Sequence, residues 1–189
     1  MVFRNEIRGI YSGNMKAFLA ITIAALTATL HAADPAGALA CLQNLPAKYR
    51  DGVLKLSADN ADPNPDTWYL VVQRSGDDAN IRNLTVTDGQ ITSDRRTLGF
   101  REIFSQASPV SVDKVSVDSR DAFGIAQRYA EANGRKVGSV SFALQQSGGS
   151  AAPVWSVWCY GPSGSYLGLM KLLATDGTVI YNDAFSRKP

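Results

Sequence analysis

Histidine is almost missing from this sequence: His31 is the only one in 189 residues. The Ser-His-Asp and Cys-His arrangements of many hydrolases need an imidazole, and so do the usual histidine-based zinc sites. If His31 does not belong to the working protein, all of these sites are excluded. The position of His31 therefore matters for the range of functions that the chain can have.

The segment from about Met15 to Ala32 is typical of a secretory signal peptide. Lys16 supplies a positive charge, an apolar run follows from Ala17 to Leu30, and the small residue Ala32 precedes the expected cleavage. Met15 is the expected start, because the residues before it do not fit this plan. The apolar run is shorter than the roughly 20 residues that span a bilayer, which disfavours a membrane anchor. We expect residues 1–32 to be removed, and the rest to work in the periplasm or outside the cell without inserting into a membrane.

The chain that remains without the leader has a net charge of zero. The leader carries three basic residues and one acidic residue, so lysine plus arginine fall from 19 to 16 and acidic residues from 17 to 16. A neutral chain lacks the basic patch that binds nucleic acid or an anionic membrane. His31 leaves with the same segment. We therefore expect no nucleic-acid partner, no cofactor and no metal, and we predict no catalytic residues.

Two cysteines remain, Cys41 and Cys159. Thiols tend to be oxidised outside the cytoplasm, so the pair permits one disulfide that closes a very long loop. The alternative is a pair of free buried thiols that pack as small hydrophobic side chains. Both alternatives stay open, because a sequence does not show whether two Cα atoms come close enough to be bridged.

Two stretches of the chain share one pattern. Trp68 and Trp155 each open a strand-like run, which is followed by a turn, a second apolar strand, Thr-Asp-Gly and a short strand. The offset from tryptophan to aspartate is 20 residues for Trp68 and Asp88, and 21 residues for Trp155 and Asp176. Asp-Gly is a common hairpin sequence, so coincidence is the alternative. The agreement of tryptophan, spacing and Thr-Asp-Gly favours a duplication.

A helical pattern precedes each stretch. Ser119 to Asn133 has apolar residues at helical spacing and can be capped by Asp118 or Ser119, and Val137 to Leu144 then alternates like a half-buried strand. The earlier helix, Ala36 to Tyr49, is weaker and is interrupted by Pro46. We therefore expect an α+β fold of two repeated units, each with a helix packed on one face of an antiparallel sheet of three to four strands. The first unit spans residues 33–94, a connecting segment 95–117 and the second unit 118–189.

The second unit resembles a PepSY-type domain. The resemblance rests on the helix DAFGIAQRYAEANG, the strand VGSVSFAL, the Trp155 strand and the closing LLATDGTVI, and it covers about Asp118 to Tyr181. Residues Ala36 to Ile91 match more loosely. The resemblance implies a two-layer fold in an exported bacterial protein that lacks catalytic residues. It also implies binding to peptidases, which such domains inhibit or chaperone.

Side chains alternate along the strand from Trp155 to Tyr160. If Trp155 faces the helices, Trp158 and Tyr160 point to the open face of the sheet. The matching places in the first unit are held by Tyr69 and Val71. We therefore predict a binding patch made of these residues on the open face: Tyr69, Val71, Trp158 and Tyr160.

The strand from Tyr166 to Ala174 is apolar on both alternating sets of side chains. This pattern is typical of a strand that is covered on both faces, so something should cover the open side. The candidates are the connecting segment Arg95 to Phe104, a second copy of the chain and a partner protein. An exposed apolar patch of this kind usually marks a protein contact.

Paired carboxylates are the remaining route to catalysis, because glycosidases use two acids and no histidine. The candidate pairs lie in turns, where aspartate is favoured for backbone reasons: Asp77 with Asp78, Asp59 with Asp62, and Asp113 with Asp118. We therefore expect an exported, non-enzymatic binding or regulatory protein, such as a modulator of a secreted or periplasmic peptidase. The alternatives are a carboxylate-dependent hydrolase and a structural homodimer of the cell envelope.

Overall fold

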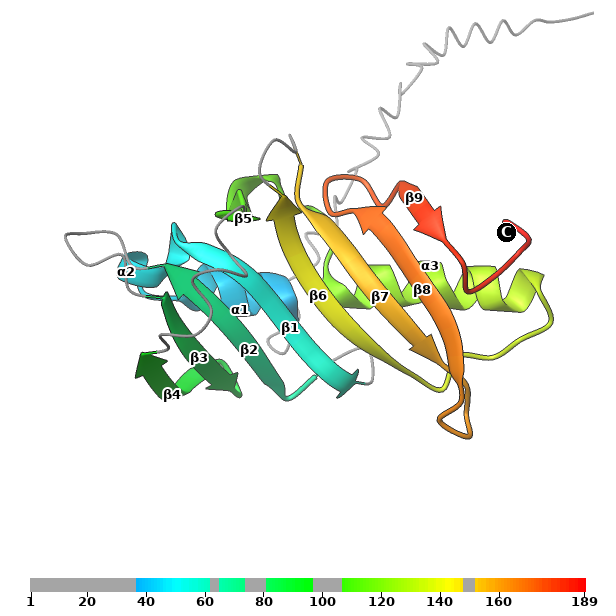
Figure 1. Cartoon of the computed structure of the whole chain (residues 1–189), viewed down its shortest axis with the longest axis horizontal. Coiled ribbons are helices and arrows are strands. Elements are labelled where there is room, and N and C mark those ends of the chain that lie inside the picture. The colour runs from blue at the N-terminus through cyan, green and yellow to red at the C-terminus, as the bar shows by residue number, and fades with distance from the viewer. Residues whose placement is uncertain (1–36, 62–64, 74–80, 97–106, 148–151) are drawn as a thin grey trace, which may run out of the picture. The chain divides into compact units, whose positions relative to one another are not determined.

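A single antiparallel sheet organises the chain in the computed structural model, which describes residues 37–61, 65–73, 81–96, 107–147 and 152–189. The strand order is β4-β3-β2-β1-β6-β7-β8-β9, and β5 pairs with β6 off this path (Figure 1). The elements are α1 (Ala38–Asn44), α2 (Ala47–Arg50), β1 (Val53–Ala61), β2 (Thr67–Gln73), β3 (Ile81–Thr87), β4 (Gln90–Arg96), β5 (Ala107–Ser108), the 3₁₀ helix η1 (Val112–Lys114), α3 (Ser119–Ala132), β6 (Ser139–Ser147), β7 (Val154–Tyr160), β8 (Tyr166–Leu173) and β9 (Val179–Asn182).

The predicted fold class, two repeated helix-plus-sheet units, is wrong. Strand β1 pairs antiparallel with β6, with Leu56 opposite Leu144 and Ser57 opposite Ala143. The strands of both halves therefore form one sheet, which has nine strands in the described residues. The physical reason is that β1 and β6 would each be an exposed sheet edge if the halves were separate. Pairing them satisfies their backbone groups and removes two edges at once.

The first helical segment is divided where the sequence has its proline. Helix α1 ends at Asn44, and α2 begins at Ala47, directly after Pro46. Proline has no backbone N–H to donate and disfavours helical geometry in the residue before it, which explains the break at Leu45. The single weak helix predicted over Ala36 to Tyr49 is therefore two short helices in the described part of that range.

Helix α3 agrees closely with its prediction. It runs over Ser119–Ala132, against the expected Ser119 to Asn133, and Asp118 is its N-cap in a capping box with Asp121. The Asp118 side chain accepts a hydrogen bond from the N-terminal turn, while the Asp121 carboxylate accepts one from the Asp118 N–H at 3.2 Å. These bonds satisfy donors that a helix start leaves without an intrahelical partner.

Three aromatic rings lie at the centre of the hydrophobic core, near the join between the two halves of the sheet. Trp155 lies 5.9 Å from Phe142 and 6.5 Å from Trp68, measured between ring centroids. The Trp155 indole N–H also donates to the Val117 carbonyl at 2.9 Å, which fixes the ring against the segment that leads into α3. Buried residues of α1, α3 and the sheet belong to this same core cluster. The two tryptophans of the repeated pattern are therefore core residues.

The two Thr-Asp-Gly sequences form different turns. Asp88 and Gly89 have φ of 50° and 73°, and their neighbours Thr87 and Gln90 pair directly, as in the two-residue type I′ turn expected for Asp-Gly. In the second half, β8 ends at Leu173 and β9 begins only at Val179. The same tripeptide therefore closes a tight hairpin in one half and a wider connection in the other.

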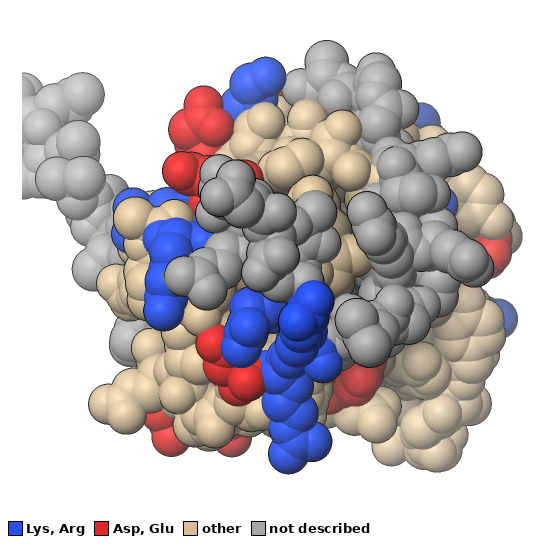
Figure 2. Space-filling model, turned by 60° about the vertical axis from the view of Figure 1, so that its left-hand side comes forward, with Lys and Arg blue, Asp and Glu red and all other residues tan. Residues whose placement is uncertain are grey.

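The first sheet edge, β4, is strongly polar. Its last three residues are Asp94, Arg95 and Arg96, and all three are exposed. Figure 2, seen from the side that carries β4, shows basic and acidic side chains next to each other in the part of this surface that is described. Charged side chains on an edge strand oppose pairing with another chain.

Candidate functional site

The face of the sheet that points away from the core carries the sequence-predicted binding residues. Trp68 and Trp155 are buried, and the alternation along β2 and β7 therefore places Tyr69, Val71, Trp158 and Tyr160 on the opposite side. Tyr69 is 48% exposed, and the other three are half-buried.

Two further tyrosines, which the sequence analysis did not predict as binding residues, lie on this face. Tyr166 pairs with Tyr160 in the sheet, and their ring centroids lie 5.7 Å apart. Tyr181 pairs with Lys171, whose ammonium group lies 5.9 Å from the centroid of the Tyr181 ring. Tyr166 is 57% exposed and Tyr181 47%. We call the following residues the aromatic face: Tyr69, Val71, Trp158, Tyr160, Tyr166 and Tyr181.

One continuous row of paired residues crosses the aromatic face. It starts at Tyr69 on β2 and ends at Tyr181 on β9, and the residues between them are Ser57, Ala143, Ser156 and Lys171. Five strand spacings of about 4.8 Å separate the ends, so the two tyrosines stand about 24 Å apart. Small side chains fill most of the row. The aromatic face therefore has two aromatic groups, one on β2 and one on β7 to β9.

Asp183 organises the second of these groups. Its carboxylate accepts hydrogen bonds from the Tyr181 hydroxyl at 3.0 Å and from the Leu169 backbone N–H. The bond to Asp183 raises the pKa of Tyr181. Partial burial, followed by the charge of Asp183, raises the pKa of Tyr166. Both phenols therefore stay neutral at physiological pH. The Tyr166 hydroxyl can donate to a partner, whereas the Tyr181 hydroxyl already donates to Asp183 and offers a partner its oxygen as an acceptor.

Strand β8 is covered on one face and partly open on the other. Gly168, Met170 and Leu172 are buried on the core side. On the other side Leu169 and Leu173 are only half-buried. Leu167, next to an irregular step in the pairing, is half-buried and packs against the core. The sequence predicted that both faces of this strand are covered, but only the core face is fully covered. The proposed covering segment, Arg95 to Phe104, lies outside the described residues from position 97 onward, as do the leader residues 1–32.

The two cysteines are free and buried in the structure. Burial raises the pKa of Cys41 to about 12. Burial, together with the charge of Asp183, raises the pKa of Cys159 to about 12 as well. Of the two alternatives, free thiols that pack in the core and a disulfide, the structure has the first.

The acidic pairs do not come together as a reactive site in the described residues. Asp118 is buried and caps a helix, whereas Asp113 is exposed in η1. Asp62, Asp77 and Asp78 lie outside the described residues. The part of the chain that the structure describes contains no group of three or more His, Cys, Asp or Glu side chains arranged to hold a metal ion. It also contains no helix that is long and apolar enough to cross a membrane.

Comparison with known proteins gives no relative from which a function could be taken. No protein-family model matches the chain, and neither a curated protein nor a solved structure matches it. The aromatic face and the chemistry of its residues are therefore what can indicate a function.

Proposed function

We propose that this chain is an exported binding protein that inhibits a secreted or periplasmic peptidase through its aromatic face. The observation that supports this most strongly is the position of the exposed tyrosines. Of the four large hydrophobic side chains that are exposed among the described residues, three are Tyr69, Tyr166 and Tyr181, and all three lie on this one face.

The chemistry of the aromatic face suits a protein partner. Tyrosine and tryptophan are the residues most often found as energetic anchors at protein interfaces, because they bury a large apolar area and keep a polar group. The row from Tyr69 to Tyr181, about 24 Å long, matches the width of a standard interface of about 800 Å² per partner. The half-buried Leu169 and Leu173 of β8 add apolar area to the same face.

The choice of a peptidase as the partner is supported by the resemblance of residues 118–181 to a PepSY-type domain. The single sheet does not alter the short motifs on which this resemblance depends. The signal-peptide pattern supports this choice, because an exported chain would share a compartment with exported peptidases.

The proposal is tested by adding the purified full chain to the exported protein fraction of the cells that make it, and measuring hydrolysis of a peptide substrate. We expect inhibition that saturates. A variant with Tyr69→Ala, Tyr166→Ala and Tyr181→Ala should need at least about 30-fold more protein for half-maximal inhibition, since one interface anchor contributes about 2 kcal/mol or more.

The matched control changes three exposed side chains on α3, away from the aromatic face: Gln127→Ala, Arg128→Ala and Glu131→Ala. This variant should inhibit like the original chain. Equal inhibition by the tyrosine variant would show that the aromatic face is not the binding surface. If the original chain leaves hydrolysis unchanged, the partner is not a peptidase of that fraction.

A further inference from the structure

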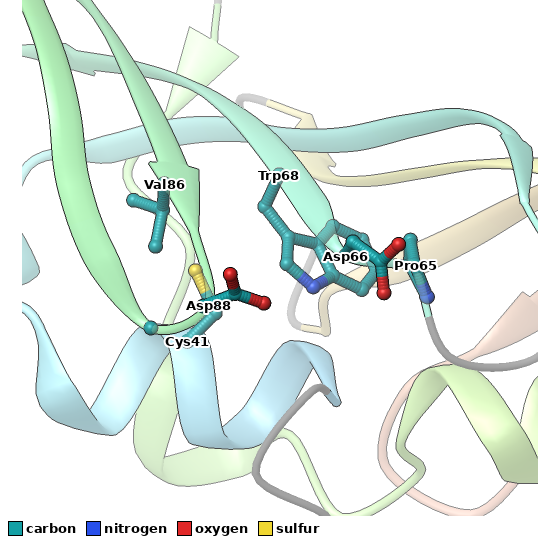
Figure 3. A pocket seen from close by; sticks show the side chains of 7 residues that line it. Cys41, Pro65, Asp66, Trp68, Val86 and Asp88 are labelled. Atoms are coloured by element: carbon teal, nitrogen blue, oxygen red, sulfur yellow. The ribbon is translucent and has the colours of Figure 1, made fainter.

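A cavity of about 200 Å³ opens on the other side of the sheet from the aromatic face. It lies between α1 and the ends of β2 and β3, and Figure 3 shows the side chains that surround it. Trp68 and Val86 reach it from the core side of the sheet, and Cys41 reaches it from α1. The site is therefore independent of the proposed peptidase-binding surface.

The inner wall of the cavity is apolar and uncharged. Trp68 and Val86 are almost completely buried, and Cys41 is only 4% exposed. In Figure 3 the Cys41 sulfur points toward the space between Val86 and Asp88. Within the described residues the thiol makes no hydrogen bond, and its raised pKa of about 12 keeps it protonated. The protonated thiol therefore adds to the apolar wall as a small hydrophobic side chain.

The rim of the cavity is anionic. Asp66 and Asp88 are exposed at its mouth, and a hydrogen bond of 3.1 Å from the Asp88 N–H to the Asp66 carbonyl holds their backbones together. Both carboxylates are visible beside the Trp68 indole in Figure 3. Neither forms a salt bridge with a lysine or arginine of the described chain. Two exposed carboxylates at the mouth of an apolar cavity attract an organic cation by Coulomb attraction.

The corresponding place in the second half of the chain is filled. There the Thr-Asp-Gly turn lies under the longer helix α3, and a Cβ atom added at Gly177 would lie 2.9 Å from the Ile125 side chain. The Asp176 carboxylate accepts a hydrogen bond from the Thr178 N–H at 2.8 Å. The shortness of α1 leaves the equivalent space open in the first half.

We propose that this cavity binds a small organic ammonium ion, with its apolar group against Trp68, Val86 and Cys41 and its ammonium group between Asp66 and Asp88. The cavity is large enough for the apolar group of such a ligand, because an apolar cavity of about 150 Å³ holds benzene. Benzylammonium therefore matches both the volume and the charge. A free amine and the lysine side chain of a peptide share this chemistry.

The test is calorimetric titration of the full chain with three ligands of similar shape: benzylammonium, benzyl alcohol and benzoate. We expect benzylammonium to saturate one site and to bind at least about 10-fold more tightly than benzyl alcohol, and benzoate to show no saturation. Nα-acetyl-lysine amide is titrated in parallel. Tighter binding of benzylammonium would indicate a free amine as the natural ligand, and tighter binding of the lysine amide would indicate the lysine side chain of a peptide. The preference for the cation should decrease at high salt, since the carboxylates are exposed.

Two variants assign the binding to the carboxylates. Asp66→Asn together with Asp88→Asn keeps the shape of the rim, and asparagine tolerates the positive φ of residue 88. This variant should bind benzylammonium no more tightly than benzyl alcohol, whereas Asp176→Asn should change nothing. The proposal is overturned if none of the ligands saturates, if all three bind equally, or if the double variant keeps the preference for the cation.

Discussion

The carboxylate of Asp118 accepts a hydrogen bond of 3.1 Å from the backbone N–H of Leu39, which lies 79 residues earlier in the chain. The same oxygen accepts the Ser119 N–H at 2.7 Å, and the Ser119 hydroxyl accepts the Ala38 N–H at 3.4 Å. One buried carboxylate therefore caps the starts of both α1 and α3. This position suits a negative charge, because the N-termini of helices carry partial positive charge.

Replacing Asp118 should destabilise the fold. Asp118→Ala removes the cap of α3 and leaves the Leu39 N–H without its acceptor, so we expect the free energy of unfolding to fall by about 2–3 kcal/mol. Denaturation with urea measures the change. Asp113→Ala, at an exposed aspartate, serves as the control and should stay within about 0.5 kcal/mol of the original chain. Equal stability of the two variants would contradict the shared cap.

The cysteines should be unreactive in the folded protein. Burial raises the pKa of Cys41 and Cys159 to about 12, and the thiolate is the form that reacts with Ellman's reagent. We expect almost no labelling at pH 8 without denaturant, and two reactive thiols per chain in denaturant without a reducing agent. A denatured chain with no reactive thiol would show that the two cysteines are bonded.

The Asp94 carboxylate should titrate below its usual range. Partial burial raises its pKa, but the hydrogen bonds from Arg82 and Tyr49, both 2.5 Å long, outweigh that effect and lower it. A lowered pKa in the folded state means that Asp94 stabilises the fold above about pH 4 and loses this effect as the pH falls through the folded-state value.

Carboxyl carbon NMR can follow this titration directly. Tyr49→Phe and Arg82→Gln should each move the pKa of Asp94 upward, toward the ordinary value for aspartate. Asp51→Asn, at the exposed aspartate that directly follows α2, should leave the pKa of Asp94 unchanged. If the pKa of Asp94 responds to neither of the first two changes, these hydrogen bonds are not the cause of its lowering.

The features that the sequence predicted correctly depend on neighbouring residues. The capped helix from Ser119 follows from Asp118 and the spacing of its apolar residues, and the alternation around Trp155 correctly separates the core side from the side of Trp158. The break at Pro46 is also a local effect. In each case the deciding contacts lie within about one turn or one strand.

The features that the sequence did not predict depend on long-range pairing. Nothing in the residues around Ser57 shows that Ala143 will pair with it, so the merger of the two halves into one sheet has no local signal. Tyr166 and Tyr181 enter the aromatic face through the register of β7 to β9, which includes irregular steps after Cys159 and Lys171. The open cavity near Cys41 likewise depends on how far α1 reaches over the sheet.

The most direct test of the central claim is hydroxyl-radical footprinting of the full chain, with and without the inhibited peptidase. We expect oxidation of Tyr69, Tyr166 and Tyr181 to fall several-fold in the complex, because the partner would cover these exposed rings. Oxidation of Ile125 on α3, on the other side of the sheet, should stay the same. Unchanged oxidation of all three tyrosines in a chain that still inhibits would contradict the proposal that the aromatic face binds the partner.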